Sequence, residues 1–355
     1  MSGAAHPSKP SGGPAAISEK RRLRPSFLLL LSGTAIAAGL ALSVTTGAAD
    51  IRLDTALNAL LHYDENQVQH YTVMSVRLPR ALTAVLVGAC FGISGAMMQG
   101  MTRNPLASPS LMGVSAGAGF ALVIAMALFP GLSYQRMIFV SLLGAAFGTL
   151  IVYAAGTISS SLASGANAHV RLALAGAAVS AMLHALSEGI QIYYGIAQEV
   201  MYWYAAGIAG VKWEDVRAIL PWTVAGVLSA LMLSRSITLL SLGDEVAAGL
   251  GQRLKRVKLL GSLTVFMLTG AAVAVAGPIG FIGLVIPHLT RFLIGVDYRY
   301  VIPCSGMLGG ALLVTADTIA RLVNPPQETP VGILTALIGV PFFLYLARKE
   351  RNGGT

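Results

Sequence analysis

Charged residues are scarce in this sequence. Asp, Glu, Lys and Arg together make up 11% of the 355 residues, whereas a soluble domain carries about a quarter. So few charges cannot cover the surface that several globular domains would expose. The scarcity excludes a disordered chain and an ordinary cytosolic enzyme, and it favours a protein embedded in a membrane.

Cysteine and catalytic motifs are also missing or rare. The two cysteines, Cys90 and Cys304, lie far apart and form no CxxC pair, which excludes a disulfide scaffold and indicates small apolar core residues. No lysine follows a glycine, so the phosphate-binding GxxxxGK[ST] loop is absent, as is HExxH. We therefore predict no enzyme activity, no cofactor and no metal site. If ATP drives this protein, a separate subunit hydrolyses it.

The sequence is rich in long apolar runs. The chain is 55% hydrophobic with a mean hydropathy of +0.71, and crossing the membrane core takes about 20 apolar residues. These features predict an all-α membrane protein with ten transmembrane helices. The predicted spans lie near 27–47, 81–100, 111–130, 137–158, 170–194, 218–240, 259–276, 279–294, 302–323 and 331–347.

The basic residues set the predicted orientation. With the N-terminus inside, 17 of the 24 Lys and Arg residues fall in cytoplasmic segments, so both termini are predicted to be cytoplasmic. This spread between apolar runs also argues that the net charge of +9 reflects topology and not nucleic-acid binding. We expect a disordered cytoplasmic tail over 1–26, a transmembrane domain over 27–349 and a short cytoplasmic tail over 350–355. The first run is interpreted as an uncleaved helix, since a signal peptide would be shorter.

Ionisable residues inside spans are candidates for function. His184 and Glu188 lie four apart on one helix face, and they are predicted either to line a polar pathway or to form a structural pair. Asp317 and Arg321 also share a face, and for them we favour a local pair that hides charge from lipid.

Glycine and proline motifs carry a family resemblance. GxxxG spacings recur at Gly88–Gly92, Gly113–Gly117, Gly144–Gly148 and Gly306–Gly310 and predict close helix packing. The chain resembles the FecCD-type permeases of bacterial ABC importers for iron–siderophore complexes, haem and vitamin B12. The matching segments are Arg77–Arg80, Arg103–Ala107, Gly113–Ala118, Leu242–Gly251, Gly277–Arg291, Ala316–Arg321 and Pro330–Gly339, which together cover about residues 77 to 349. The tail over 1–26 carries no part of the resemblance.

The resemblance implies a type II ABC importer permease fold with ten transmembrane helices in the bacterial inner membrane. It implies an extracytoplasmic substrate-binding protein, a cytoplasmic ABC ATPase and a second permease subunit, either a copy of this chain or a related one. The expected function is passage of an iron(III)–siderophore complex to the cytosol. Haem or vitamin B12 is the alternative within the family, and a proton-coupled transporter using His184 and Glu188 is the alternative of another class.

The resemblance also implies roles for individual residues. Arg77, Arg80 and Arg321 match outer-rim arginines that face carboxylates of the binding protein, and anchoring to lipid headgroups is the alternative. Asn104 and Leu106 match positions near the cytoplasmic gate, for which a plain turn is the alternative. The segment that matches the helix coupling the permease to the ATPase consists of Leu242, Gly243, Asp244, Glu245, Val246, Ala247, Ala248, Gly249, Leu250 and Gly251.

Overall fold

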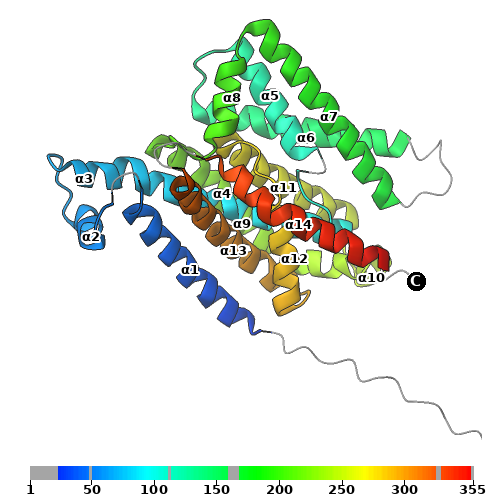
Figure 1. Ribbon diagram of the computed structural model, residues 1–355. Helices are drawn as coiled ribbons and strands as arrows, with labels where there is room; N and C mark the ends of the chain where they lie inside the picture. Colours follow the sequence, from blue (N-terminus) through cyan, green and yellow to red (C-terminus); the bar gives the residue numbers. More distant parts are fainter. Residues whose placement is uncertain (1–22, 48–49, 111–112, 159–167, 325–328, 353–355) are drawn as a thin grey trace, which may run out of the picture.

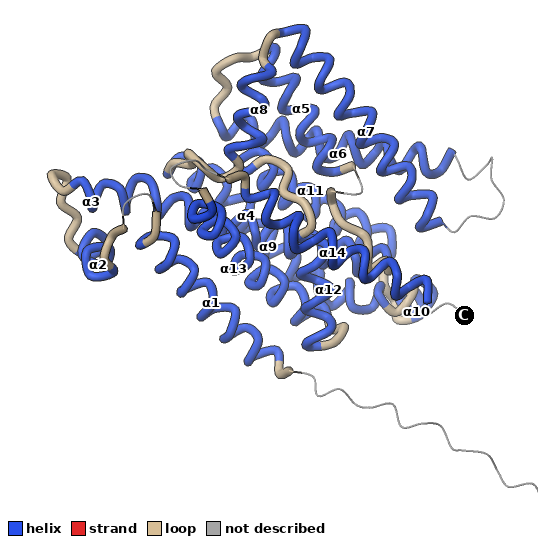
Figure 2. Tube along the Cα trace, viewed as in Figure 1, coloured by secondary structure: helices blue, strands red, loops and turns tan. Residues whose placement is uncertain are grey.

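The chain folds as a bundle of helices. The computed structural model describes residues 23–47, 50–110, 113–158, 168–324 and 329–352 (Figure 1). Within these residues every regular element is a helix (Figure 2). Most of the predicted N-terminal tail, residues 1–22, and the last part of the C-terminal tail, residues 353–355, lie outside the described residues.

Each of the ten predicted apolar runs coincides with a helix in the described part of the chain. These helices are α1 (Pro25–Thr45), α4 (Leu78–Thr102), α5 (Val114–Leu128), α6 (Tyr134–Ile158), α7 (Ala168–Tyr194), α9 (Trp213–Ser241), α11 (Leu254–Ala276), α12 (Ile282–Ile294), α13 (Tyr298–Val323) and α14 (Val331–Asn352). By length and composition, six helices of the described residues can cross a membrane, and three shorter ones are apolar.

The three shorter apolar helices are α5, α12 and the Val331–Tyr345 part of α14. The 13 residues of α12 span about 20 Å, which is less than the hydrocarbon core of about 30 Å. The run predicted over 279–294 therefore becomes a helix only from Ile282, since Gly277 has a positive φ and Pro278 and Gly280 precede the helix without joining it.

Short helices occupy the longer connections of the described residues. The segment between α1 and α4 forms α2 (Leu53–Leu61), α3 (Val68–Tyr71) and the π-helix η1 (Thr72–Arg77), which runs directly into α4. The aromatic connection after α7 forms α8 (Ala197–Ala206), and the segment predicted as a coupling helix forms α10 (Asp244–Gly249). Figure 1 shows α2 and α3 at one end of the bundle, here named the α2 end, and α10 at the opposite end, the α10 end.

Helix α4 forms the centre of the bundle and packs against α9, α11, α12 and α13. The GxxxG motifs make this packing close, because a Cβ atom on Gly88 would overlap the carbonyl of Gly309 and one on Gly92 would overlap that of Ser305. In the same way the motif of α5 meets the motif of α6, Gly117 against Gly144. The four predicted motifs thus pair two by two, which confirms the prediction of close packing.

The edge of the bundle is formed by α1, α7 and α14. Helix α1 packs on α13, and α7 packs on α5 and α6. All three helices expose large apolar side chains, such as Leu30 of α1, Leu186 of α7 and Leu337 of α14. Surfaces of this kind are stable where lipid or another apolar surface covers them.

Candidate functional site

An ion pair joins α4 to α13 at the α2 end of the bundle. Arg80 Nη2 lies 2.8 Å from Asp317 Oδ1, and Arg80 Nε donates to both carboxylate oxygens at 3.1 and 3.0 Å. The two side chains are 9% and 1% exposed. The two-pronged geometry matches the fork of the guanidinium to the carboxylate and makes this a strong, charge-assisted contact.

Arg321 adds a second cation to the same carboxylate. Its Nε lies 3.5 Å from Asp317 Oδ2, one helical turn away. The guanidinium also donates to Ser43 Oγ at 2.6 Å and to the Ser43 carbonyl at 3.1 Å. The local pair predicted from the sequence is therefore present, but the closer partner of Asp317 is Arg80 on another helix, which sequence reasoning missed.

Arg77 binds the end of α1. Its Nη1 donates to the carbonyls of Val44 at 2.8 Å and Thr45 at 2.9 Å. The last turn of a helix leaves carbonyls without intrahelical partners and carries partial negative charge, so a guanidinium is favourable there. Gly47 allows the approach, because a Cβ atom at that position would lie 2.9 Å from Arg77 Nη2.

These residues, Arg77, Arg80, Asp317 and Arg321, are named the arginine cluster. The structure brings together the three arginines that the family resemblance singles out, from η1, α4 and α13. Their guanidinium groups contact Asp317 and the end of α1, so each of the three side chains already has partners within the chain. The cluster holds three positive charges and one negative charge, so it remains positive.

Helix α10 presents an apolar stripe away from the bundle. Val246 of α10 is 49% exposed, and Leu242 and Leu250, which flank the helix at its two ends, are 57% and 62% exposed. The opposite side of the helix is buried through Ala247, which packs between Leu240 of α9 and Val257 of α11. A helix that is half anchored and half exposed can both receive a partner and transmit its movement to α9 and α11.

Asp244 fixes the start of α10. Its carboxylate accepts a hydrogen bond from Lys258 Nζ at 2.6 Å, and Arg103 lies 4.0 Å away. The hydrogen bond from Lys258 is the main cause that lowers the pKa of Asp244 below its ordinary value. The carboxylate therefore stays charged throughout the neutral pH range and ties α10 to the N-terminal part of α11.

Asn104 and Leu106 form a turn directly after α4. The Leu106 amide donates to Asn104 Oδ1 at 2.9 Å, and the Ala107 amide donates to the Asn104 carbonyl at 3.1 Å. Arg103, with a φ of 52°, ends the helix in the left-handed region. This is the geometry that the plain-turn alternative requires, and it lies in the same region as α10, since Arg103 contacts Asp244.

His184 and Glu188 lie on the exposed face of α7. The neighbouring face of the helix buries Leu183 and Ser187. In the part of the chain that the structure describes, no hydrogen bond or ion pair joins His184 to Glu188. The structural-pair alternative therefore has no contact to support it, and the two side chains face away from this chain's own core.

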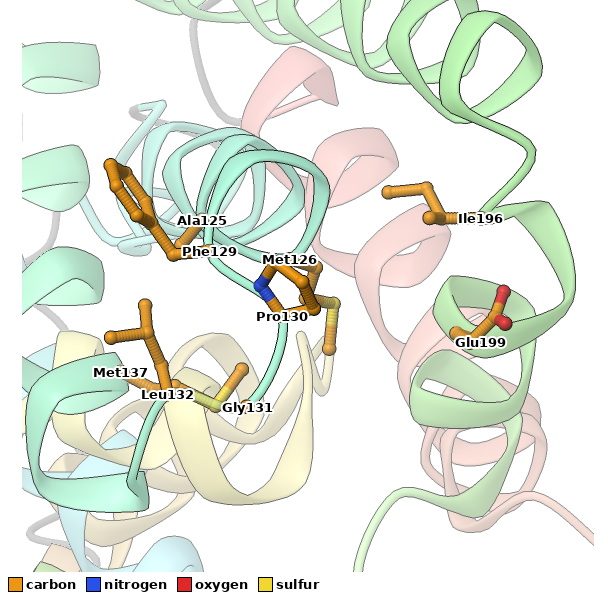
Figure 3. A pocket seen from close by; sticks show the side chains of 9 residues that line it. All are labelled: Ala125, Met126, Phe129, Pro130, Gly131, Leu132, Met137, Ile196 and Glu199. Carbon is orange, nitrogen blue, oxygen red and sulfur yellow. The ribbon is translucent and has the colours of Figure 1, made fainter.

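A hollow of about 310 Å³ opens between α5, α6 and α8 (Figure 3). Met126, Pro130 and Met137 form one wall, and Ile196 and Glu199 form the other. Its size is at the lower limit for a small-molecule site. Glu199, which is exposed, is the only charged residue among those that line this hollow.

Both cysteines are buried, as predicted. Cys90 Sγ lies 3.3 Å from Thr223 Oγ1, and Cys304 is a buried residue of α13.

The helical bundle and its membrane-length apolar helices define a helical membrane protein. The sequence matches the FecCD transport family over residues 17–349. The chain belongs to this family. It is a multi-pass inner-membrane permease of an ABC importer and not an enzyme, so ATP hydrolysis takes place on a separate subunit and a substrate-binding protein delivers the cargo.

Curated relatives span most of the chain. It is 52% identical over 329 residues to the iron(3+)-hydroxamate import system permease protein FhuB of Bacillus subtilis, covering 92% of this chain and 85% of FhuB. It is 38% identical to the ferric enterobactin permease protein FepD of Escherichia coli, covering 93% and 96%. It is 36% identical to the cobalamin import permease protein BtuC of Halobacterium salinarum, covering 92% and 89%.

A solved structure of an inward-facing metal-chelate-type ABC transporter has the same fold. It superposes with a TM-score of 0.75 at 29% identity and covers 91% of this chain and 99% of its own. The fold predicted from the family resemblance is confirmed at this level.

Proposed function

We propose that this permease carries iron(III)–siderophore complexes, and among them the hydroxamate class. The observation that carries the proposal is the 52% identity to the iron(3+)-hydroxamate permease protein over 92% of the chain. Relatives for enterobactin and cobalamin are less similar, at 38% and 36%. Haem or vitamin B12 remains the alternative cargo within the family.

A competition assay tests the substrate. Cells that lack their own permease, but express this chain with its ATPase and binding protein, are given radioactive iron as a hydroxamate, a catecholate or a citrate complex, and separately labelled cobalamin and haem. We expect accumulation of the hydroxamate complex. Accumulation of cobalamin or haem with no uptake of any iron chelate would contradict the proposal.

We further propose ten transmembrane helices with both termini in the cytosol. Residues 27–349 then form the permease domain, and 1–26 and 350–355 are cytoplasmic segments. The ten apolar runs and the 17 of 24 basic residues on one side support this arrangement. It assigns the α2 end to the outside and the α10 end to the cytosol. Labelling of single cysteines in sealed cells with an impermeant reagent tests each loop.

The arginine cluster is proposed to receive the binding protein. Its net positive charge at the proposed outer end supports an attraction for carboxylates. Because the arginines are already bonded inside the chain, we propose that the cluster acts mainly through its field, by steering and orienting the incoming protein. The same bonds hold α1 to α4 and α13, so the residues have a structural role as well.

Helix α10 is proposed to lie in a groove of the ATPase. The exposed stripe of Leu242, Val246 and Leu250 supports an apolar partner, and the anchoring through Ala247 and Asp244 supports transmission of a rigid-body movement. The turn at Asn104 and Leu106 is proposed to act at the cytoplasmic gate, because Arg103 links it to the first turn of α10.

A second permease subunit is proposed to cover the exposed sides of α7 and α14. Apolar side chains at Met182, Leu186 and Leu337 support such a contact. His184 and Glu188 are exposed on a different face of α7, because residues two apart on a helix point about 200° apart, and they are proposed to face the pathway between the two subunits. Cross-linking of single cysteines at these positions in the assembled transporter tests the arrangement.

A further inference from the structure

Helix α2 has more apolar surface than the protein covers. Its Ala56 and Ala59 are buried at 3% and 0% exposure, in a small core with Val44, Ile51 and Val73. Beside these alanines lie Leu53, Leu57, Leu60 and Leu61, which are spaced by four, three and one residues and so share one face. All four leucines are about half exposed or more, and Leu61 reaches 75%.

The third side of α2 is polar. Asp54, Thr55 and Asn58 follow one another around the helix opposite the leucine face. The helix therefore offers one face to the protein, one to an apolar medium and one to water. A helix with these three faces is stable where an apolar medium and water meet beside a protein.

The position of α2 agrees with such a boundary. It begins eight residues after α1 ends at Thr45, and it packs against α1 and η1 at the edge of the bundle. In Figure 1 α2 is viewed nearly end-on, whereas α1 runs along the page, so α2 lies across the direction of the bundle. Exposed Leu42 of α1 and exposed Val76 of η1 continue the apolar surface towards the membrane-length helices.

Charge decides which apolar medium covers the leucine face. Residues 50–65 contain Asp50, Asp54, Asp64 and Glu65 but a single cation, Arg52, which already pairs with Asp54 at 3.3 Å. This surplus of negative charge repels a protein surface that carries carboxylates, such as the one proposed to meet the arginine cluster. Tyr63 and Tyr71, both exposed, are residues that favour the level of the lipid headgroups.

We propose that α2 is an interfacial anchor that lies in the outer leaflet, with Leu53, Leu57, Leu60 and Leu61 in the lipid and Asp54 and Asn58 in water. The inference rests on the proposed orientation, which assigns α2 to the outside. The anchor holds the end of α1 at a fixed depth. Since the carbonyls of that end bind Arg77 and Arg321, the anchor also holds the arginine cluster level with the membrane surface.

Fluorescence quenching at two adjacent positions tests the anchor. Leu57→Cys and the matched control Asn58→Cys are each made in the full chain, assembled with its ATPase, and labelled with an environment-sensitive dye. Both positions are exposed in the chain, and the native cysteines are buried, so the label goes to the new site. The labelled transporters are reconstituted in vesicles that contain phosphatidylcholine with a nitroxide near the top of the acyl chain.

The lipid nitroxide is expected to quench the dye at Leu57→Cys strongly and to blue-shift its emission, while iodide added in water quenches the dye at Asn58→Cys. Equal quenching by iodide at both positions would overturn the anchor. Shielding of Leu57→Cys that needs added binding protein, or cross-linking of Leu57→Cys between two chains, would overturn it in favour of a protein partner.

The same labels separate the anchor from the proposed orientation. In intact cells, external iodide is expected to reach Asn58→Cys. If it reaches this residue only from the cytosolic side, the outer-leaflet location and the orientation are both wrong, while lipid quenching at Leu57→Cys still reports on the anchor itself.

Discussion

Asp317 is a buried carboxylate that forms ion pairs with two arginines. It is 1% exposed and bonds two arginines, one from its own helix and one from α4. Removing one partner of a buried ion pair leaves a charge without compensation, which costs about 3–5 kcal/mol, whereas replacing both partners by apolar residues is often nearly neutral. The residue is therefore structural at the proposed outer end.

We predict that Asp317→Asn destabilises the chain by about 3–5 kcal/mol. The double variant Arg80→Met with Asp317→Leu is expected to regain most of the loss, because it leaves neither Arg80 nor Asp317 as an unpaired charge, while Arg321 keeps its hydrogen bonds to Ser43. Thermal unfolding of the purified protein in detergent measures both. Equal losses in the single and the double variant would show that the pair is not the source of the effect.

The steering role of the cluster makes a separate prediction. Arg77→Gln removes a positive charge and is expected to slow association of the binding protein at low salt, and the difference from wild type is expected to vanish at high salt. Arg77→Lys keeps the charge and serves as the control. Association rates in nanodiscs measure the effect. A loss that is the same for both variants and independent of salt would assign Arg77 a structural role alone.

At the scale of elements, the sequence predicts much of the fold. Apolar length alone locates ten of the helices in the described residues, and the GxxxG spacings predict close packing. The partners of each motif could not be predicted, because Gly88 and Gly309 are far apart in the sequence and small residues fit many neighbours. The pairing of Arg80 with Asp317 has no sequence signal either. The short length of α12 follows from local glycines and a proline, which a window of about 20 apolar residues overlooks.

The crossing of α4 and α13 can be tested by adding one methyl group. Gly88→Ala forces a Cβ atom into the carbonyl of Gly309, so we predict a loss of more than about 2 kcal/mol or no folded protein. Gly189→Ala of α7 meets no atom within 4 Å, and it is expected to be neutral or to gain about 0.5–1 kcal/mol from helix propensity. Folded yield and thermal unfolding compare the two. Similar behaviour of both variants would refute the close approach.

The proposed coupling helix makes a prediction about energy transfer. Val246→Asp places a charge in the exposed stripe of α10 and is expected to abolish uptake while the ATPase keeps its basal activity, since the variant leaves the buried side of α10 intact. Val296→Asp is the control, because Val296 is also exposed, at 55% against 49%, in the connection between α12 and α13. Uptake and ATP hydrolysis are measured in proteoliposomes. Normal uptake by Val246→Asp would remove α10 from the interface.

At the scale of the whole molecule, the chain is a bundle whose edge helices expose apolar surface that this chain does not cover. Helices α1, α7 and α14 expose apolar surface, and α10 exposes a stripe at one end while the arginine cluster sits at the other. The scarcity of charge predicts a membrane-embedded chain, and the missing phosphate-binding loop predicts that a separate subunit hydrolyses ATP. The sequence could not predict which exposed surfaces meet lipid and which meet a protein, because both are apolar.

The account depends most on the claim that this chain is a conduit driven by another molecule. Transport by the chain, its ATPase and its binding protein in proteoliposomes tests that claim directly, with a ferric hydroxamate as cargo. We predict accumulation that requires ATP and a hydrolysis-competent ATPase and that persists when a protonophore collapses the proton gradient. Accumulation by the chain without the ATPase, or accumulation that the protonophore abolishes while ATP remains, would contradict the account.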